Sequence, residues 1–181
     1  MGEQLRLPTM GMSALASCDW HWWRLILDAQ SRGRAALPSD LGLALDVAWL
    51  LWLRLGLTAN DQHDELRQQL LELRASQRQQ LEALLLGYAV NVDSPLMARV
   101  VATAAMASGH LWQDLGLPDR PTLRLLLTHH FPALVARNVH NLRWKKFFYR
   151  LLCEQGGDYL CPAPNCSDCH ERQSCMEDSA G

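Results

Sequence analysis

Hydrophobic side chains recur at intervals of three and four residues along most of the chain, with Gln, Arg, Glu and Asp between them. This spacing places the apolar positions on one face of an α-helix. The run from 41 to 55 is apolar nearly all round, which is typical of a buried helix. Six segments are predicted to be helical on this basis: 19 to 33, 41 to 55, 60 to 86 with a break near residue 76, 94 to 116, 123 to 130 and 138 to 153.

Capping and breaking residues mark the ends of several of these helices. Asp19 can accept hydrogen bonds from the first backbone N–H groups of the helix that follows it. Ser94 with Pro95 is a strong helix start, and Gly56 is suited to end a helix. Pro132 should end the helix before it. The C-terminal tail contains no helical period, so it needs another source of order.

The composition favours helices over strands. Leu occurs 35 times, whereas Val and Ile together occur eight times, and β-branched side chains are the ones that favour strands. We therefore predict an all-α fold of five to seven helices with an irregular C-terminal four-cysteine loop. Its predicted parts are a flexible arm at 1 to 18, a helical domain at 19 to 153 and a Cys-rich tail at 154 to 181.

The net charge and the hydropathy of the chain indicate which partners it can bind and where in the cell it is located. Seventeen basic and 19 acidic residues give a formal net charge of −2, which leaves no excess to neutralise nucleic-acid phosphates. The longest apolar run, 41 to 57, contains Asp46 and Arg54 and is shorter than the roughly 20 residues of a bilayer span. No secretory signal pattern opens the chain. The sequence thus predicts a cytoplasmic protein that binds neither nucleic acid nor membrane.

Four of the six cysteines lie close together near the C-terminus, as Cys161, Cys166, Cys169 and Cys175 in the pattern C-x4-C-x2-C-x5-C. In a cytosolic chain such a group indicates metal binding rather than disulfides. Four-cysteine zinc sites commonly present two tight pairs about 15 residues apart, and this segment has no second tight pair. Short unequal gaps are typical of iron–sulfur clusters. The spacing favours a cluster, with a zinc-stapled tail as the alternative.

A basic segment precedes these cysteines and contains both lysines of the chain. At 100° per residue, Trp144, Phe147 and Phe148 share one face of the predicted helix, which we expect to be core. The basic side chains beside that face are suited to stabilising buried thiolates, to attracting an oxyanion such as molybdate, or to docking an acidic partner surface. A solvated helix face is the alternative interpretation. The residues concerned are Arg143, Lys145, Lys146 and Arg150.

Several short stretches follow one another in a distinctive order. They are His110-Leu-Trp-Gln-Asp-Leu-Gly-Leu117, His129-His-Phe-Pro132, Ala136-Arg-Asn138, Leu142-Arg-Trp-Lys-Lys-Phe-Phe-Tyr-Arg-Leu-Leu-Cys153 and the four-cysteine tail. In order and spacing, these stretches resemble the NifQ family of molybdenum-delivery proteins, which act in the biosynthesis of the nitrogenase cofactor. The resemblance covers roughly residues 108 to 177.

The resemblance implies a cytoplasmic carrier rather than a turnover enzyme. Such a protein would hold a molybdenum–iron–sulfur cluster of the three-iron type on the four tail cysteines. Molybdate would be the source of the metal, so some reduction must occur on the way. The carrier would donate molybdenum to the cofactor scaffold complex and the nitrogenase iron protein. Further candidate ligands are Cys153, as a fifth sulfur, and three histidines that suit a molybdenum corner: His129, His130 and His170.

Two other classes of protein compete with this interpretation. A helical DNA-repair glycosylase also ends in a four-cysteine iron–sulfur loop with similar gaps. Such an enzyme should carry a helix–hairpin–helix turn, which this sequence lacks, and the net charge of −2 disfavours DNA binding. The other alternative is a zinc-tailed interaction module without a transfer function. No Gly-rich phosphate loop, Gly-x-Ser-x-Gly or His-Glu-x-x-His motif supports hydrolytic chemistry.

Overall fold

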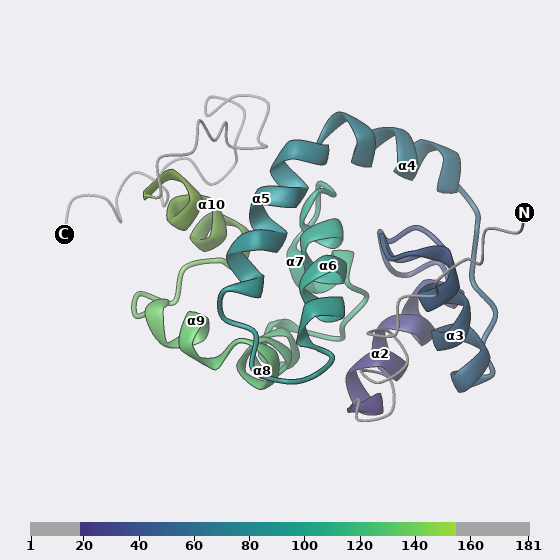
Figure 1. The fold of residues 1–181 in the computed structure, drawn as a ribbon, viewed down its shortest axis with the longest axis horizontal. Coiled ribbons are helices and arrows are strands. Elements are labelled where there is room, and N and C mark those ends of the chain that lie inside the picture. Colours follow the sequence, from purple (N-terminus) through teal and green to yellow (C-terminus); the bar gives the residue numbers. More distant parts are fainter. Residues whose placement is uncertain (1–18, 155–181) are drawn as a thin grey trace, which may run out of the picture.

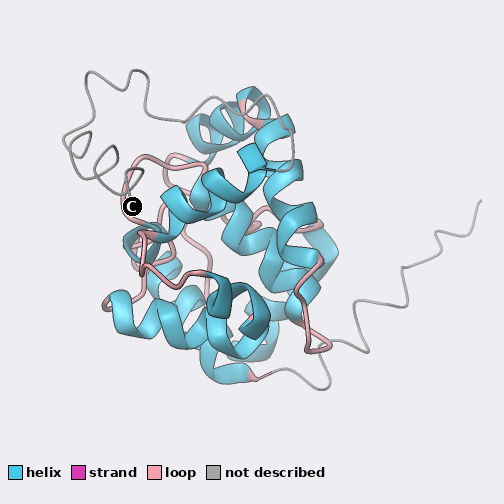
Figure 2. Ribbon diagram, turned by 90° about the vertical axis from the view of Figure 1, so that its left-hand side faces the viewer, coloured by secondary structure: helices cyan, strands magenta, loops and turns pink. Residues whose placement is uncertain are grey.

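The computed structural model describes residues 19 to 154, and all regular secondary structure in this range is α-helical (Figure 2). The all-α class is confirmed, but the predicted number of helices is wrong, because this range alone contains nine (Figure 1). The predicted arm and cysteine loop lie outside the described residues. The helices are α2 (Trp20–Ser31), α3 (Leu45–Leu55), α4 (Asp64–Leu73), α5 (Ala75–Leu86), α6 (Ser94–Ala105), α7 (Leu111–Asp114), α8 (Arg120–His130), α9 (Pro132–Arg137) and α10 (Trp144–Glu154).

Local breaks explain the additional helices. The segment from 60 to 86 divides into α4 and α5 at Arg74, whose φ of −111° departs from helical geometry, close to the predicted break. The segment from 94 to 116 is interrupted by a bend at 107 to 109, which separates α6 from the short α7. Pro132 follows the last residues of α8, as predicted, and it also opens α9, because proline fits the first turn of a helix.

Two predicted helices start later than expected because left-handed residues precede them. Leu41 and Gly42 have φ values of 59° and 76°, so α3 begins at Leu45 rather than at 41. Asn141 has a φ of 51°, and α10 begins at Trp144 rather than at 138. A residue in the left-handed region cannot continue a right-handed helix.

The core is centred on α6, which packs against α5 in the middle of the molecule (Figure 1). Met97 and Val100 of α6 are fully buried. The helices α2 and α3 lie on one side of this pair, and α9 and α10 lie on the other. Trp23, Phe131 and Phe148 are the largest fully buried side chains and come from three separate parts of the chain. The start of α10 is therefore held on a packed helical body.

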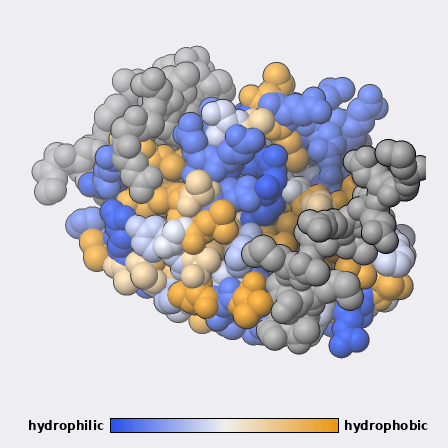
Figure 3. Space-filling view, in the orientation of Figure 1, coloured by the Kyte–Doolittle hydropathy of each residue, from blue (hydrophilic) through white to orange (hydrophobic). Residues whose placement is uncertain are grey.

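The surface mixes polar and apolar side chains on the face shown in Figure 3. Apolar residues exposed on helices include Trp49 of α3 and Leu66 and Leu73 of α4. Within the described range, no helix combines the length and the hydropathy that crossing a bilayer requires.

The turn after α7 brings this helix against α2. Gly116 donates its N–H to the carbonyl of Gln113 at 2.9 Å, and its φ is +73°. A Cβ at this position would overlap the Cβ of Ala29, which is buried in α2. The position therefore favours glycine through both its backbone conformation and the close approach of a neighbouring helix.

Gly116→Ala should lower the free energy of unfolding by about 3 kcal/mol, because it combines a left-handed alanine with an overpacked contact. Gly56→Ala is the matched control: Gly56 has a φ of +63° but no neighbour within 4 Å of an added Cβ. The control should lose only about 1 kcal/mol. Urea unfolding followed by circular dichroism measures both values, and equal losses would contradict the assigned contact with Ala29.

Candidate functional site

The tail cysteines Cys161, Cys166, Cys169 and Cys175, together with His170, lie outside the described residues. The structure bears on this site through α10, which ends at Glu154 and leads toward the tail. Cys153, in the last turn of α10, is exposed. Between residues 19 and 154, no group of three or more His, Cys, Asp or Glu side chains is arranged to hold a metal ion.

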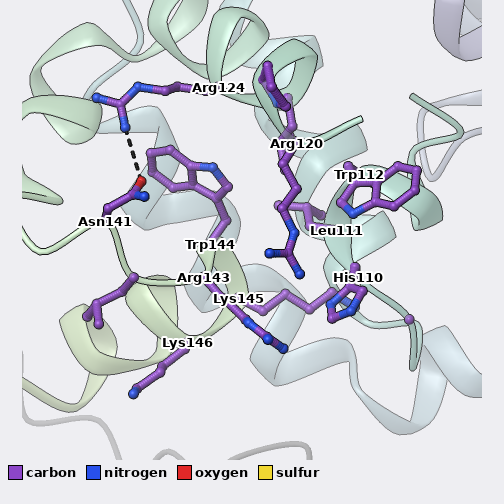
Figure 4. A pocket seen from close by; sticks show the side chains of 14 residues that line it. His110, Leu111, Trp112, Arg120, Arg124, Asn141, Arg143, Trp144, Lys145 and Lys146 are labelled. Carbon is purple, nitrogen blue, oxygen red and sulfur yellow. Dashed lines mark hydrogen bonds between the residues drawn. The ribbon is translucent and has the colours of Figure 1, made fainter. Parts of the chain in front are cut away.

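A cavity of about 410 Å³ opens between α7, the start of α8 and the start of α10 (Figure 4). Positively charged and aromatic side chains dominate its wall. None of the described residues that line it is Asp or Glu. The cationic, histidine and tryptophan side chains of the wall are His110, Trp112, Arg120, Arg124, Arg143, Trp144, Lys145 and Lys146. We call this feature the basic cavity.

The loop before α10 is fixed by the buried side chain of Asn138. Its Oδ1 accepts a hydrogen bond from the N–H of Leu142 at 2.8 Å, and its Nδ2 donates to the carbonyl of Leu142 at 2.9 Å. Asn141, inside this loop, accepts a hydrogen bond from Arg124 of α8 at 3.3 Å (Figure 4). The loop thereby places Arg143 and Trp144 at the wall of the basic cavity.

Lys145 joins α10 to α7 through a buried ion pair. Its Nζ lies 2.6 Å from Oδ2 of Asp114 and also donates to the carbonyl of Ala107 at 2.7 Å. The two charged side chains are 16% and 7% exposed. Burial raises the pKa of Asp114 and lowers the pKa of Lys145, and in each case the partner's charge opposes the shift. The carboxylate of Asp114 is therefore paired within the fold.

Asp114 offsets the charge of Lys145. The positive charge of the basic cavity therefore comes from the other cationic side chains of its wall. Arg120 is exposed and makes no ion pair with any residue between 19 and 154. The pKa of His110 is affected by these surroundings. Burial lowers it, and the nearby positive charges lower it further; these are Arg120, Arg143 and Lys145.

The four basic residues predicted from sequence do not form one surface. Arg143, Lys145 and Lys146 line the basic cavity. Arg150 lines a separate hollow of about 200 Å³ beside α9 and donates to Glu154 at 3.1 Å. Of the expected aromatic core, Phe147 and Phe148 are buried, whereas Trp144 is half-buried and lines the basic cavity.

Of the two adjacent histidines, His130 is fully buried at the end of α8. Its Nδ1 lies 3.0 Å from Oγ of Ser94, and its Nε2 has no hydrogen-bond partner among the described residues. Asp93 lies nearby and accepts a hydrogen bond from Trp23 at 2.9 Å. Burial lowers the pKa of His130 to about 4. His129 is half-buried, with its Nε2 3.8 Å from a carboxylate oxygen of Asp19.

Sequence reasoning missed several residues of the basic cavity. Arg120, Arg124 and Trp112 belong to other helices than the basic segment, and no local pattern connects them with it. Asn138 was visible only as part of a motif, without its structural role. Only the packing of α7 and α8 against the start of α10 brings these groups together.

Comparison with known proteins gives a consistent set of relatives. A family model described as NifQ matches residues 22 to 177. The chain is 41% identical over 169 residues to "Protein NifQ" of Azotobacter vinelandii, with 86% of each chain covered. It is 40% identical over 163 residues to "Protein NifQ" of Klebsiella pneumoniae, covering 86% of this chain and 97% of the relative. No solved structure matches the chain. The family match spans both the basic cavity and the four-cysteine tail.

Breaking the pair of Lys145 and Asp114 should destabilise the fold strongly. Asp114→Asn or Lys145→Met alone should lower the free energy of unfolding by about 3 kcal/mol, because each leaves a buried group without its partner. The double variant should lose less than the sum of the two. Arg150→Met is the control at an exposed pair and should lose less than about 1 kcal/mol. Additive losses in urea unfolding would contradict a direct coupling.

Acid should destabilise the metal-free chain through His130. An unfolded histidine binds its proton near pH 6.5, whereas the folded His130 binds it near pH 4. Between these values the unfolded state holds more protons, so stability is present above pH 6.5 and falls as the pH drops. The loss from pH 7 to pH 5 should be about 2 kcal/mol.

The measurement is urea unfolding at several pH values in His130→Gln and in the control His129→Gln. The first variant should flatten the dependence on pH, and the second should keep it. An unchanged slope in His130→Gln would assign the acid sensitivity to other groups.

Proposed function

The chain belongs to the NifQ family, whose members take part in the biosynthesis of the nitrogenase iron–molybdenum cofactor, and from this we propose that it is a molybdenum carrier. In this proposal the cargo is molybdenum held within an iron–sulfur cluster of the three-iron type. The protein receives the metal as molybdate and donates it to the cofactor scaffold complex and the nitrogenase iron protein. This transfer takes place in the cytoplasm.

The observation that carries the proposal is the coincidence of two features in the tail. The family match continues through residue 177 and so includes all four cysteines. Their spacing, C-x4-C-x2-C-x5-C, has the short unequal gaps of cluster-binding segments. Thiolates suit a soft, reduced metal, and four of them against three irons leave one for a further metal. Cys161, Cys166, Cys169 and Cys175 are the proposed ligands.

The helical domain supports a carrier through the way it holds α10. Phe147 and Phe148 bury one face of this helix, and Tyr149 donates to the carbonyl of Ala105 at 3.2 Å. The chain that leads to the cysteines therefore leaves a firmly packed helix. Sites on connecting or terminal segments are well placed for transfer to a partner.

The test is anaerobic purification with iron, acid-labile sulfide, molybdenum and zinc measured on the same sample. Cys161→Ala and Cys169→Ala should each lose more than about 90% of the bound iron and keep the helical circular dichroism of the parent, because each removes a cluster ligand. Cys18→Ala is the matched control and should keep the iron.

Two outcomes would overturn the proposal. One is stoichiometric zinc with neither iron nor sulfide after anaerobic reconstitution, which would indicate a zinc-stapled tail. The other is full retention of iron in both tail variants. A transfer assay to the nitrogenase cofactor scaffold, with molybdenum counted in both proteins, tests the donor role directly.

A further inference from the structure

The basic cavity has the charge of an anion site. Four cationic side chains besides Lys145 line it: Arg120 and Arg124 from α8, and Arg143 and Lys146 from the start of α10. The guanidinium group of Arg124 is turned toward Asn141, and Lys146 points away from Arg120 (Figure 4). None of the described lining residues carries a carboxylate, and the nearby Asp114 is already paired with Lys145 at 2.6 Å. Cations gathered around one concavity repel one another, so a bound anion lowers the energy of the arrangement.

The helices add to this positive potential. Both α8 and α10 begin at the basic cavity. The N-terminus of α8 is capped by Asp119, whose carboxylate accepts a hydrogen bond from the N–H of Thr122 at 2.8 Å, whereas α10 has no acidic residue in its first turn. The first turn of a helix carries partial positive charge and ordinarily favours carboxylates. Here Arg120 occupies the first turn of α8, and Lys145 and Lys146 occupy that of α10. At α10, the side chains and the backbone dipole therefore favour the same kind of ligand.

An unsatisfied donor in the wall points to a ligand with acceptor atoms. Trp112 lines the basic cavity, and its indole Nε1 is buried without a hydrogen-bond partner among the described residues. An indole N–H can only donate, and leaving it unpaired is unfavourable. An oxygen atom of a bound anion would satisfy it.

The size and lining of the basic cavity indicate which kind of anion it can bind. Its volume of about 410 Å³ accommodates a small oxyanion with some water, and its walls include Leu111 and Leu123 as well as two tryptophans. Arginine guanidinium groups match the oxygens of tetrahedral oxyanions. With a net charge of −2, the chain has no general attraction for a nucleic-acid backbone.

We propose that the basic cavity binds a tetrahedral oxyanion through Arg120, Arg143 and the indole N–H of Trp112, with Arg124 and Lys146 adding positive charge from the wall. The identification of this oxyanion as molybdate rests on the function proposed above, whereas the anion site itself does not. The basic cavity would then hold the metal in its oxidised, oxygen-bound form through N–H donors rather than through thiolates.

The experiment is equilibrium dialysis of the full-length chain against molybdate at low salt, with the bound metal measured by mass spectrometry. The double variant Arg120→Gln/Arg124→Gln should bind at least about tenfold more weakly, because it removes one charge-assisted contact and a second positive charge of the wall. Arg137→Gln/Arg150→Gln removes the same charge from the neighbouring hollow and should bind within about twofold of the parent. Trp112→Phe should weaken binding about threefold to tenfold.

The source of the oxyanion is tested by competition. Sulfate and phosphate should displace molybdate only at concentrations about tenfold higher than tungstate requires, if the site is adapted to the larger oxyanion. Equal competition by sulfate or phosphate would keep the anion site but overturn its assignment to molybdate.

A tail variant distinguishes an error in the proposed cavity site from an error in the proposed carrier function. The Cys161→Ala chain should bind molybdate as tightly as the parent, because none of the proposed oxyanion ligands is a cysteine. Loss of binding in that variant would place the oxyanion on the cysteine segment and overturn the cavity site. Absence of saturable binding, or equal weakening by both double arginine variants, would also overturn it.

Discussion

The buried contact between Lys145 and Asp114 holds the candidate site together. It fixes the start of α10 to the end of α7, and the additional bond from Lys145 to the carbonyl of Ala107 ties the same helix to the bend after α6. A pair with so little exposure cannot lose one member without leaving a buried group uncompensated. The position of Arg143 and Trp144 beside α8, and hence the basic cavity itself, follows from this attachment.

The same contact divides the basic segment by role. Lys145 is used within the fold, while Arg150 faces the hollow beside α9 and pairs with Glu154. Arg143 and Lys146 are the members of the segment that meet Arg120 at the basic cavity without sharing the structural task of Lys145. A stripe of like charge in sequence is therefore not a single functional surface, because a helix turns each successive residue by 100° toward a different neighbour.

Patterns of neighbouring residues in the sequence could predict the features that depend on local structure, namely the helices and their buried faces. Leucine periodicity gave the helices, and the aromatic face containing Phe147 and Phe148 was identified as core, because burial follows the helical period. The break at Arg74 was also predicted closely, near residue 76. The late start of α10 after Asn141 and the partner of Lys145 could not be predicted, since they depend on long-range packing. Arg120 illustrates the limit most clearly: its contribution exists only because α8 lies against the start of α10.

Molybdenum chemistry gives a reason for one chain to carry two unlike donor sets. As molybdate the metal is surrounded by hard oxygens that accept hydrogen bonds, so N–H donors and guanidinium groups hold it by charge and geometry. Once reduced, the metal prefers thiolate and sulfide, which those groups cannot supply. Under the two proposals, Arg120 and Trp112 serve the first state, and Cys161 with the other tail cysteines serves the second. The basic helix α10 leads from one donor set toward the other along the chain, so a single protein can present the metal with the ligands that each oxidation state favours.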